Sequence, residues 1–392
     1  MAVIELAALG PDFIENPFPY YAKWRADGPV HELRAGDGGR SWIVVDYGEG
    51  RSALADPRLS KSRSTAGLAE RFVDGHLLVV DPPDHTRLRR LVGRDFTPHR
   101  VEALGPRIQQ LVDGLLDAAM PEGRADLVDA LAFPLSMTIL CDLLGVPESD
   151  SEDFRRWTID MLAPADPAVA MAGSRALHDY LGRLIESRRG AAEGPDLVSA
   201  LLRTAEQDRD RLSESEVRAM AFLLVLAGHE TSVNMVANGI RALLAHPDQL
   251  ALLRSDMSLL DSAIEEMLRF EGSVETSTKR YAREPVELGG VSVPAGGLVV
   301  VSLLSANRDD RRFEDADRFD ITRASGGAGR HLAFGHGIHF CLGAPLARLE
   351  ARITIGTLLR RCPDLRLDPD AEPLRFFPGL VMRGVRHLPV RW

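Results

Sequence analysis

The residues from 213 to 246 carry the longest uninterrupted helical pattern in the chain. Ser213 and Glu216 stand three apart at its start, the spacing of a capping box, in which each side chain bonds the other's backbone N–H. The pattern continues to His246 and Pro247, so we predict a helix of about 32 residues, or ~48 Å at 1.5 Å per residue. Residues 222–227 are apolar on nearly all sides, which is typical of a buried helix. The rest of the chain must therefore pack around one helix that crosses the core.

The remaining pattern predicts a mainly α fold with a small β portion. Helical periodicity dominates residues 101–245, and residues 60–80 read as one long loop. No linker, low-complexity run or internal repeat divides the 392 residues, so we expect a single domain over residues 1–392. Further helices are predicted at 19–26, 259–269 and 345–361, strands at 42–45, 286–288, 291–293 and 298–304, and breaks at Pro121, Pro134, Pro147, Pro164 and Pro195.

Composition narrows the class of protein. A net charge of −10 argues against general nucleic-acid binding. The longest apolar run, residues 219–228, is about half of the ~20 residues that span a bilayer, and residues 1–10 lack the basic start of a signal peptide. The three cysteines are odd in number and widely spaced, which fits a reducing compartment. We therefore expect a cytoplasmic protein without a membrane anchor, and a monomer.

One cysteine stands just before a predicted helix. Residues 334–343 read Phe-Gly-His-Gly-Ile-His-Phe-Cys-Leu-Gly, and Pro345 suits the first turn of the helix that follows. The glycines at 335, 337 and 343 allow positive φ and close approach to a flat ligand. The helix N-terminus should lower the pKa of the Cys341 thiol, and a thiolate can ligate iron.

Three other interpretations of Cys341 stay open on these residues alone. Most single cysteines are small buried hydrophobic residues. A zinc site could use His331, His336, His339 and Cys341, although zinc ligands usually come in pairs from two separate elements. A Cys–His nucleophile is also possible, but closeness in sequence does not establish closeness in space.

The motif as a whole resembles the haem-binding loop of the cytochrome P-450 family, through Phe334, Gly337, Cys341 and Gly343. Residues 344–348, Ala-Pro-Leu-Ala-Arg, resemble its bacterial soluble branch. The resemblance implies that family's fold, with haem b between the long central helix and the cysteine-bearing helix. It makes Cys341 the axial ligand of the iron and places Phe334 and Gly343 beside the haem.

The long helix contains Ala227-Gly228-His229-Glu230-Thr231. The hydroxyl of Thr231 can bond the carbonyl of Ala227, four residues earlier, and open the helix locally, while Gly228 leaves a hollow. A structural kink would explain the same residues. The family resemblance instead implies that Ala227 and Gly228 border the haem and that Glu230 and Thr231 manage water and protons for oxygen activation.

The resemblance also assigns charged residues. Glu266, Arg269 and Arg318 match the family's Glu-Arg-Arg ion-pair lock, a structural role. A second set matches the ligands of the two haem propionates: His85, Arg89, Arg280 and His339. A third set could form a basic surface for an acidic ferredoxin, although solvation alone explains most such charges: Arg87, Arg90, Arg94, Arg348 and Arg352.

Taken together, the sequence predicts a haem-thiolate monooxygenase, because cysteinate ligation favours O–O cleavage. Electrons would come from ferredoxin and ferredoxin reductase, since no Gly-x-Gly-x-x-Gly fingerprint follows a strand. The expected substrate is a macrolide-like polyketide, with a steroid-like or other terpenoid molecule as the alternative. A peroxide-driven enzyme and a non-catalytic haem protein are rivals. The resemblance implies substrate contacts from Leu68, Phe72, Leu78, Leu223, Leu226, Val274, Leu380 and Val381. Glu70 and Asp74 could pair with an amino sugar, although exposed loop carboxylates are usually only solvated.

Overall fold

The structure is a computed structural model that describes residues 3–35, 38–68, 75–94, 96–162, 166–189, 194, 196–207, 212–323 and 331–392. Its α-helices are α1 (Pro11–Glu15), α2 (Phe18–Asp27), α3 (Tyr47–Ala55), α4 (Asp84–Gly93), α5 (Pro98–Glu102), α6 (Gly105–Ala119), α7 (Phe133–Leu144), α8 (Ser151–Leu162), α9 (Pro167–Arg188), α10 (Leu197–Gln207), α11 (Glu214–Ala245), α12 (Pro247–Ser255), α13 (Leu260–Glu271), α14 (Leu303–Asn307) and α15 (Ala344–Arg361). Its strands are β1 (Val3–Glu5), β2 (Val30–Arg34), β3 (Arg40–Val44), β4 (Leu59–Ser60), β5 (Arg124–Asp126), β6 (Arg280–Ala282), β7 (Val286–Leu288), β8 (Val291–Val293), β9 (Leu298–Val301), β10 (Arg366–Leu367) and β11 (Pro389–Arg391).

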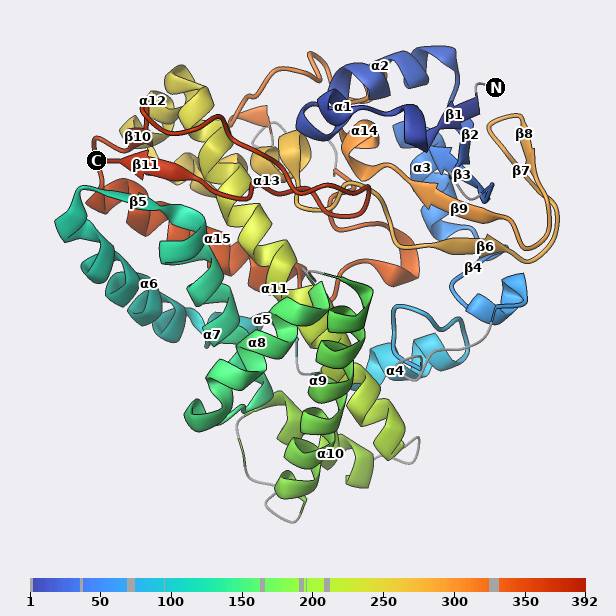
Figure 1. The fold of residues 1–392 in the computed structure, drawn as a ribbon, viewed down its shortest axis with the longest axis horizontal. Coiled ribbons are helices and arrows are strands. Elements are labelled where there is room, and N and C mark those ends of the chain that lie inside the picture. The colour runs from blue at the N-terminus through green and yellow to red at the C-terminus, as the bar shows by residue number, and fades with distance from the viewer. Residues whose placement is uncertain are drawn as a thin grey trace.

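Helix α11 is the axis of the molecule. Ser213 and Glu216 form the predicted capping box, and the helix spans 32 residues. In Figure 1 it runs through the middle of the fold, with α6 to α10 on one side and the N-terminal strands on the other. Helices α7, α13 and α15 pack directly against it. The predicted class, mainly α with a small β portion, is confirmed.

Six short strands form the main sheet, in the order β1-β2-β3-β9-β6-β4. Strand β9 lies parallel to β3, with Val299 opposite Trp42, and antiparallel to β6. The predicted strand 298–304 is too long, since β9 ends at Val301. Ser302 accepts a hydrogen bond from the backbone N–H of Ser305 at 3.2 Å and so caps α14, which begins there.

The other predicted boundaries differ less. The helices predicted at 19–26, 259–269 and 345–361 correspond to α2, α13 and α15, and the hairpin β7–β8 turns at Gly289 and Gly290 as expected. Pro134 stands in the first turn of α7 and follows a π-helical turn, Val128–Ala132. The expected breaks at Pro164 and Pro195 lie outside the described residues.

Two apolar clusters meet along α11. The N-terminal half of the helix, Val217 to Val225, packs in a cluster with α4, α7, α9 and α10. The C-terminal half, from Val233 onward, packs in a second cluster with α6, α13 and α15. In the described part of the chain, α11 is the one helix long and apolar enough to cross a membrane. Of its apolar 18-residue stretch, 61% is buried inside the protein. The apolar surface of α11 is therefore used by the core.

The predicted ion-pair lock is present with one change of partner. Arg269 donates two hydrogen bonds to Glu266, at 2.7 and 2.8 Å, and both side chains are buried. Arg323 is the second guanidinium at Glu266, at 3.3 Å. The side chain of Arg318 is exposed, and only its carbonyl takes part, accepting from Arg269 at 3.0 Å. The assignment of Arg318 was wrong because the chain turns after Phe319, whose ring is buried, and this turn brings Arg323 back to Glu266.

Candidate active site

The burial of α11 is interrupted where its two apolar clusters meet. Ala227 and Gly228 are exposed, although Val225 and Val233 on either side are buried. A Cβ added at Gly228 would have one neighbour within 4 Å, the Cδ1 atom of Leu140, at 3.9 Å. One face of the central helix is therefore open at this turn, as the predicted hollow requires.

The predicted hydrogen bond at this turn is present. The hydroxyl of Thr231 donates to the carbonyl oxygen of Ala227 at 2.7 Å. Glu230, the preceding residue, is partly buried, and this burial raises the pKa of its carboxyl. A carboxyl with a raised pKa holds its proton more readily near neutral pH, which is the property of a general acid.

A tight loop delivers Cys341 to the start of α15. Gly335 and Gly337 have φ of +74° and +75°, and a Cβ at Gly337 would lie 3.2 Å from the Cα atom of Ala55 in α3. The backbone N–H of Cys341 donates to the carbonyl of Phe334 at 2.9 Å and closes the loop. Gly343 has φ of −81°, so the expectation of a positive φ there was wrong.

Cys341 is an exposed residue, whereas Cys141 and Cys362 are buried in the two apolar clusters. Protein atoms surround its sulfur closely, and burial is the largest influence and raises the pKa of the thiol. The backbone N–H groups of Gly343 and Ala344, and the nearby Arg89, act in the opposite direction. The predicted lowering of the pKa was wrong for the protein alone, because the helix terminus does not outweigh desolvation.

The zinc interpretation of this loop is not supported. His331 lies 3.3 Å from Glu265, and that carboxylate also accepts a hydrogen bond from Arg348 at 2.6 Å. Within the described ranges, three or more metal-binding side chains cluster at one place, formed by Asp126, Asp129 and His387. This group contains none of the four predicted zinc ligands.

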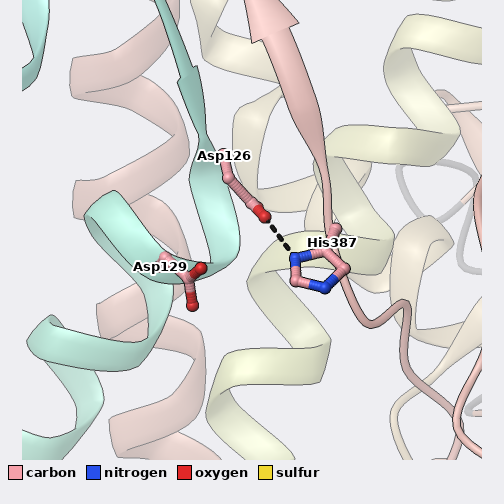
Figure 2. Close-up of side chains that lie close together, drawn as sticks. All are labelled: Asp126, Asp129 and His387. Carbon is pink, nitrogen blue, oxygen red and sulfur yellow. Dashed lines mark hydrogen bonds and ion pairs between the residues drawn. The ribbon is translucent and has the colours of Figure 1, made fainter. Parts of the chain in front are cut away.

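The Asp126, Asp129 and His387 group is explained by its own hydrogen bonds. Asp126 accepts from the Nδ1 of His387 at 2.6 Å (Figure 2). Its other oxygen accepts from the backbone N–H groups of Val128 and Leu388, at 3.0 and 2.8 Å. This carboxylate therefore joins the end of β5 to the segment before β11, which is a structural role.

The four predicted propionate ligands come together beside Cys341. The rings of His85 and His339 have centroids 4.2 Å apart, and His85 and Arg280 are buried. Arg89 lies near enough to lower the pKa of His85, after burial, and to act on Cys341. Burial, then His85, lowers the pKa of His339 to about 3.

Lys61 belongs to the same group, and the sequence analysis missed it. Its ammonium group is buried at the end of β4 and acts on the pKa of His339. The five side chains of this basic cluster are Lys61, His85, Arg89, Arg280 and His339. Asp81 is the carboxylate that acts to raise the pKa of Lys61, His85, Arg280 and His339. It already accepts hydrogen bonds from Ser60 and Arg283, at 2.5 and 2.6 Å. The buried cations Lys61 and Arg280, together with the guanidinium of Arg89 and two imidazole rings, fit a doubly negative ligand such as the two propionates of haem.

Glu350 is a second residue that the sequence analysis did not single out. It lies in α15 and is buried, and the hydroxyl of Ser232 in α11 donates a hydrogen bond to it. Burial raises the pKa of this carboxyl to about 7. The sequence feature that could have identified Glu350 is its position as the one acidic residue among the apolar positions of residues 346–359.

Two of the predicted substrate segments lie side by side. The backbone N–H of Glu275 donates to the carbonyl of Val381 at 2.9 Å, and the hydroxyl of Thr276 donates to the carbonyl of Leu380 at 2.6 Å. Val274 forms an antiparallel bridge with Met382. The side chain of Val381 remains 51% exposed, so it is free to contact a ligand.

The other predicted substrate residues are more scattered. Leu223 is buried in the apolar cluster around α9 and α10, against which Leu78 also packs. Leu226 is partly buried, next to the open turn, and Leu68 is 43% exposed. Phe72, Glu70 and Asp74 lie outside the described residues.

The predicted basic surface is partly neutralised. Arg87 pairs with Glu216, the capping residue of α11. Arg348 pairs with Glu265, and Arg352 with Asp261 at 3.2 Å. Because each of these arginines is paired with a carboxylate, its positive charge is partly offset and attracts an acidic partner less strongly. Arg90 and Arg94 in and after α4 also take part in interactions, so the surface is less basic than the sequence indicates.

Comparison with known proteins gives consistent results over the chain. The family model described as Cytochrome P450 matches residues 169–387. The Cytochrome P450 monooxygenase PikC of Streptomyces venezuelae is 54% identical over 100% of this chain and 94% of its own. The Vitamin D(3) 25-hydroxylase of Pseudonocardia autotrophica is 44% identical over 96% and 94%. The solved structure of the bacillaene polyketide synthase cytochrome P450 PksS of Bacillus subtilis 168 has a TM-score of 0.91 and 34% identity, over 97% of this chain and 98% of that one.

Proposed function

Since this chain belongs to the cytochrome P450 family and is a monooxygenase, we propose that it inserts one oxygen atom of O2 into a C–H or C=C bond of a macrolide-like polyketide. The observation that carries the proposal is the exposed Cys341 at the start of α15, beside a cluster of basic side chains, with α15 packed against the helix α11 that contains the open turn. The family implies a haem iron with a cysteine thiolate ligand, and we assign haem b to this site and the ligand role to Cys341.

The basic cluster supports the haem assignment by its charge. His85, Arg89, Arg280 and His339 would hold the two propionates, because buried carboxylates need charged donors. Ala227, Gly228, Phe334 and Gly343 would border the ring. When bound, the haem supplies the oxidant that attacks an unactivated C–H bond.

Thr231 and Glu230 would control protons at the open turn. Because the Thr231 hydroxyl donates its hydrogen to Ala227, its oxygen can accept a hydrogen bond from a water molecule. The raised pKa of the Glu230 carboxyl allows it to pass a proton to that water. A non-catalytic haem protein would have no use for this pair.

The remaining proposals concern substrate and partner. Val274, Leu380 and Val381 would line one side of the substrate, joined by Leu68, Phe72, Leu78, Leu223 and Leu226. A steroid-like or other terpenoid molecule, which the enzyme would hydroxylate, is the second candidate substrate. The Vitamin D(3) 25-hydroxylase relative supports it. Ferredoxin and ferredoxin reductase would supply the electrons to a monomeric cytoplasmic enzyme.

The test is a spectroscopic titration of the purified haem protein. The Soret band is recorded while macrolactones, glycosylated macrolides, steroids and fatty acids are added in turn. A shift from low to high spin with the macrolide class supports the proposal, and a shift with steroids alone replaces it with the second candidate. Product formation that needs NADPH, ferredoxin and reductase separates the monooxygenase from a peroxide-driven enzyme.

A further inference from the structure

Lys61 is a buried cation whose ammonium group donates hydrogen bonds to neutral oxygen atoms. Its side chain is 3% exposed, at the end of β4. The Nζ atom donates to the carbonyl of Lys279 at 2.9 Å and to the hydroxyl of Thr278. An ammonium group has three N–H donors and carries a full charge, so two neutral acceptors leave one donor for a further ligand and no carboxylate hydrogen-bonded to the Nζ atom.

The nearest carboxylate belongs to Asp81, and other donors use it. Its Oδ1 accepts from the backbone N–H of Lys61 at 2.9 Å, and its Oδ2 accepts from the hydroxyl of Ser60 and the guanidinium of Arg283. Asp81 therefore fixes the backbone at Lys61, and its hydrogen bonds come from donors other than Nζ, while its charge acts on the ammonium group without a direct bond.

Like charges surround the ammonium group. Burial and then Arg280 lower the pKa of Lys61, whereas Asp81 acts to raise the pKa of both Lys61 and Arg280, which is itself buried. Burying an amine beside a guanidinium is unfavourable when one carboxylate, already hydrogen-bonded to other donors, is the anion that offsets both charges. The position of Lys61 is thus suited to a negatively charged ligand of the same site.

We propose that Lys61 is a fifth side chain that binds the haem propionates, in addition to the four that the family resemblance assigns. The inference rests on the proposed function. Lys61 also holds the backbone at Thr278 and Lys279, directly before Arg280, and the guanidinium of Arg280 donates to the carbonyl of Thr278 at 3.2 Å. Lys61 therefore acts on the site both by its charge and by positioning Arg280.

The test compares Lys61→Met with Lys279→Met in the purified holoenzyme. The two lysines carry the same charge, but Lys279 is exposed, which makes it the matched control. Transfer of haem to an excess of apomyoglobin should be about tenfold or more faster for Lys61→Met, since a charged hydrogen bond is lost, and unchanged for Lys279→Met. Lys61→Arg, which keeps the charge, should restore most of the retention.

The reduction potential separates a charge effect from a packing effect. Ferric haem carries one more positive charge than ferrous haem, so removing a nearby cation should make the potential more negative in Lys61→Met but not in Lys279→Met. A lower thermal stability of Lys61→Met with an unchanged potential and unchanged haem release would overturn the proposal and leave a structural lysine. If the unmodified protein binds no haem, the proposed function fails instead.

Discussion

The hydroxyl of Thr231 lies 2.7 Å from the carbonyl oxygen of Ala227, within the open turn of α11. Thr231→Ala should keep haem and substrate binding but divert electrons from product to peroxide, because the water that delivers protons loses its anchor. The measurement is the ratio of product formed to NADPH consumed, and we expect a fall of at least several-fold, in line with the loss of a positioned acid–base group.

Thr158→Ala is the matched control for that change. Thr158 donates to the carbonyl of Phe154, four residues earlier in α8, at 2.8 Å and is fully buried. It repeats the same helical bond away from the open turn, so its removal should affect stability and leave coupling intact. Equal coupling in Thr231→Ala and the parent would remove the role assigned to Thr231.

Replacing Cys341 should change the spectrum without unfolding the protein. Cys341→Ala should abolish the thiolate-type Soret band of the reduced carbon monoxide complex, since that band requires a cysteine thiolate ligand. Cys362→Ala, a change in the core, should keep that spectrum at some loss of stability. A thiolate spectrum in Cys341→Ala would contradict the ligand assignment.

The two arginines near Glu266 should differ in their effect on stability. Arg323→Gln removes a guanidinium that contacts Glu266 and donates to the carbonyl of Glu314, so it should lower the free energy of unfolding by about 1–3 kcal/mol. Arg318→Gln, on an exposed side chain, should change it by less than about 0.5 kcal/mol. Urea denaturation compares them, and equal losses would favour the original assignment of Arg318.

Glu350 should make stability depend on pH. Its carboxyl has a pKa of about 7 in the fold, above the ordinary value of 4.5, so the folded protein holds more protons than the unfolded chain between these values. Stability should therefore fall as pH rises from about 4.5 to about 7, by up to about 1.4 kcal/mol per pH unit. Glu350→Gln removes this term, and its stability advantage over the parent should be larger at pH 8 than at pH 5.

The control for this pH effect is Glu372→Gln, on an exposed side chain. Other carboxyls whose pKa is raised by burial, such as Asp46, Glu230 and Glu275, are present in every variant, so their effect cancels in the comparison. A difference between Glu350→Gln and the parent that is the same at both pH values would show that the carboxyl does not titrate in this range.

Local chemistry made much of the fold predictable. The capping box of Ser213 and Glu216 and the apolar pattern after it define α11 without reference to any other element. The Thr231 bond is equally local, because it spans one helical turn. Strand β9 was predicted too long because its run of apolar residues continues into α14. Ser302 caps α14, but one serine is a weaker indication of a helix start than this apolar run is of a strand.

Contacts between distant parts of the chain were less predictable. Arg323 replaces Arg318 at Glu266 because of a turn that no local pattern specifies. Lys61 reaches Thr278 across 217 residues of sequence, and Glu350 reaches Ser232 in another helix. The four residues expected to bind the propionates could be named because the family resemblance supplies their positions, whereas no resemblance pointed to these single residues.

The contact between Arg87 and Glu216 links two functions in space. Glu216 caps α11, and Arg87 lies on α4, the helix that also carries His85 and Arg89. An acidic electron donor that captured Arg87 would have to compete with the cap itself. The side chain of Arg87 would therefore take part both in docking at α4 and in the contact with the capping residue of α11, so a partner that bound this guanidinium would weaken the first turn of α11.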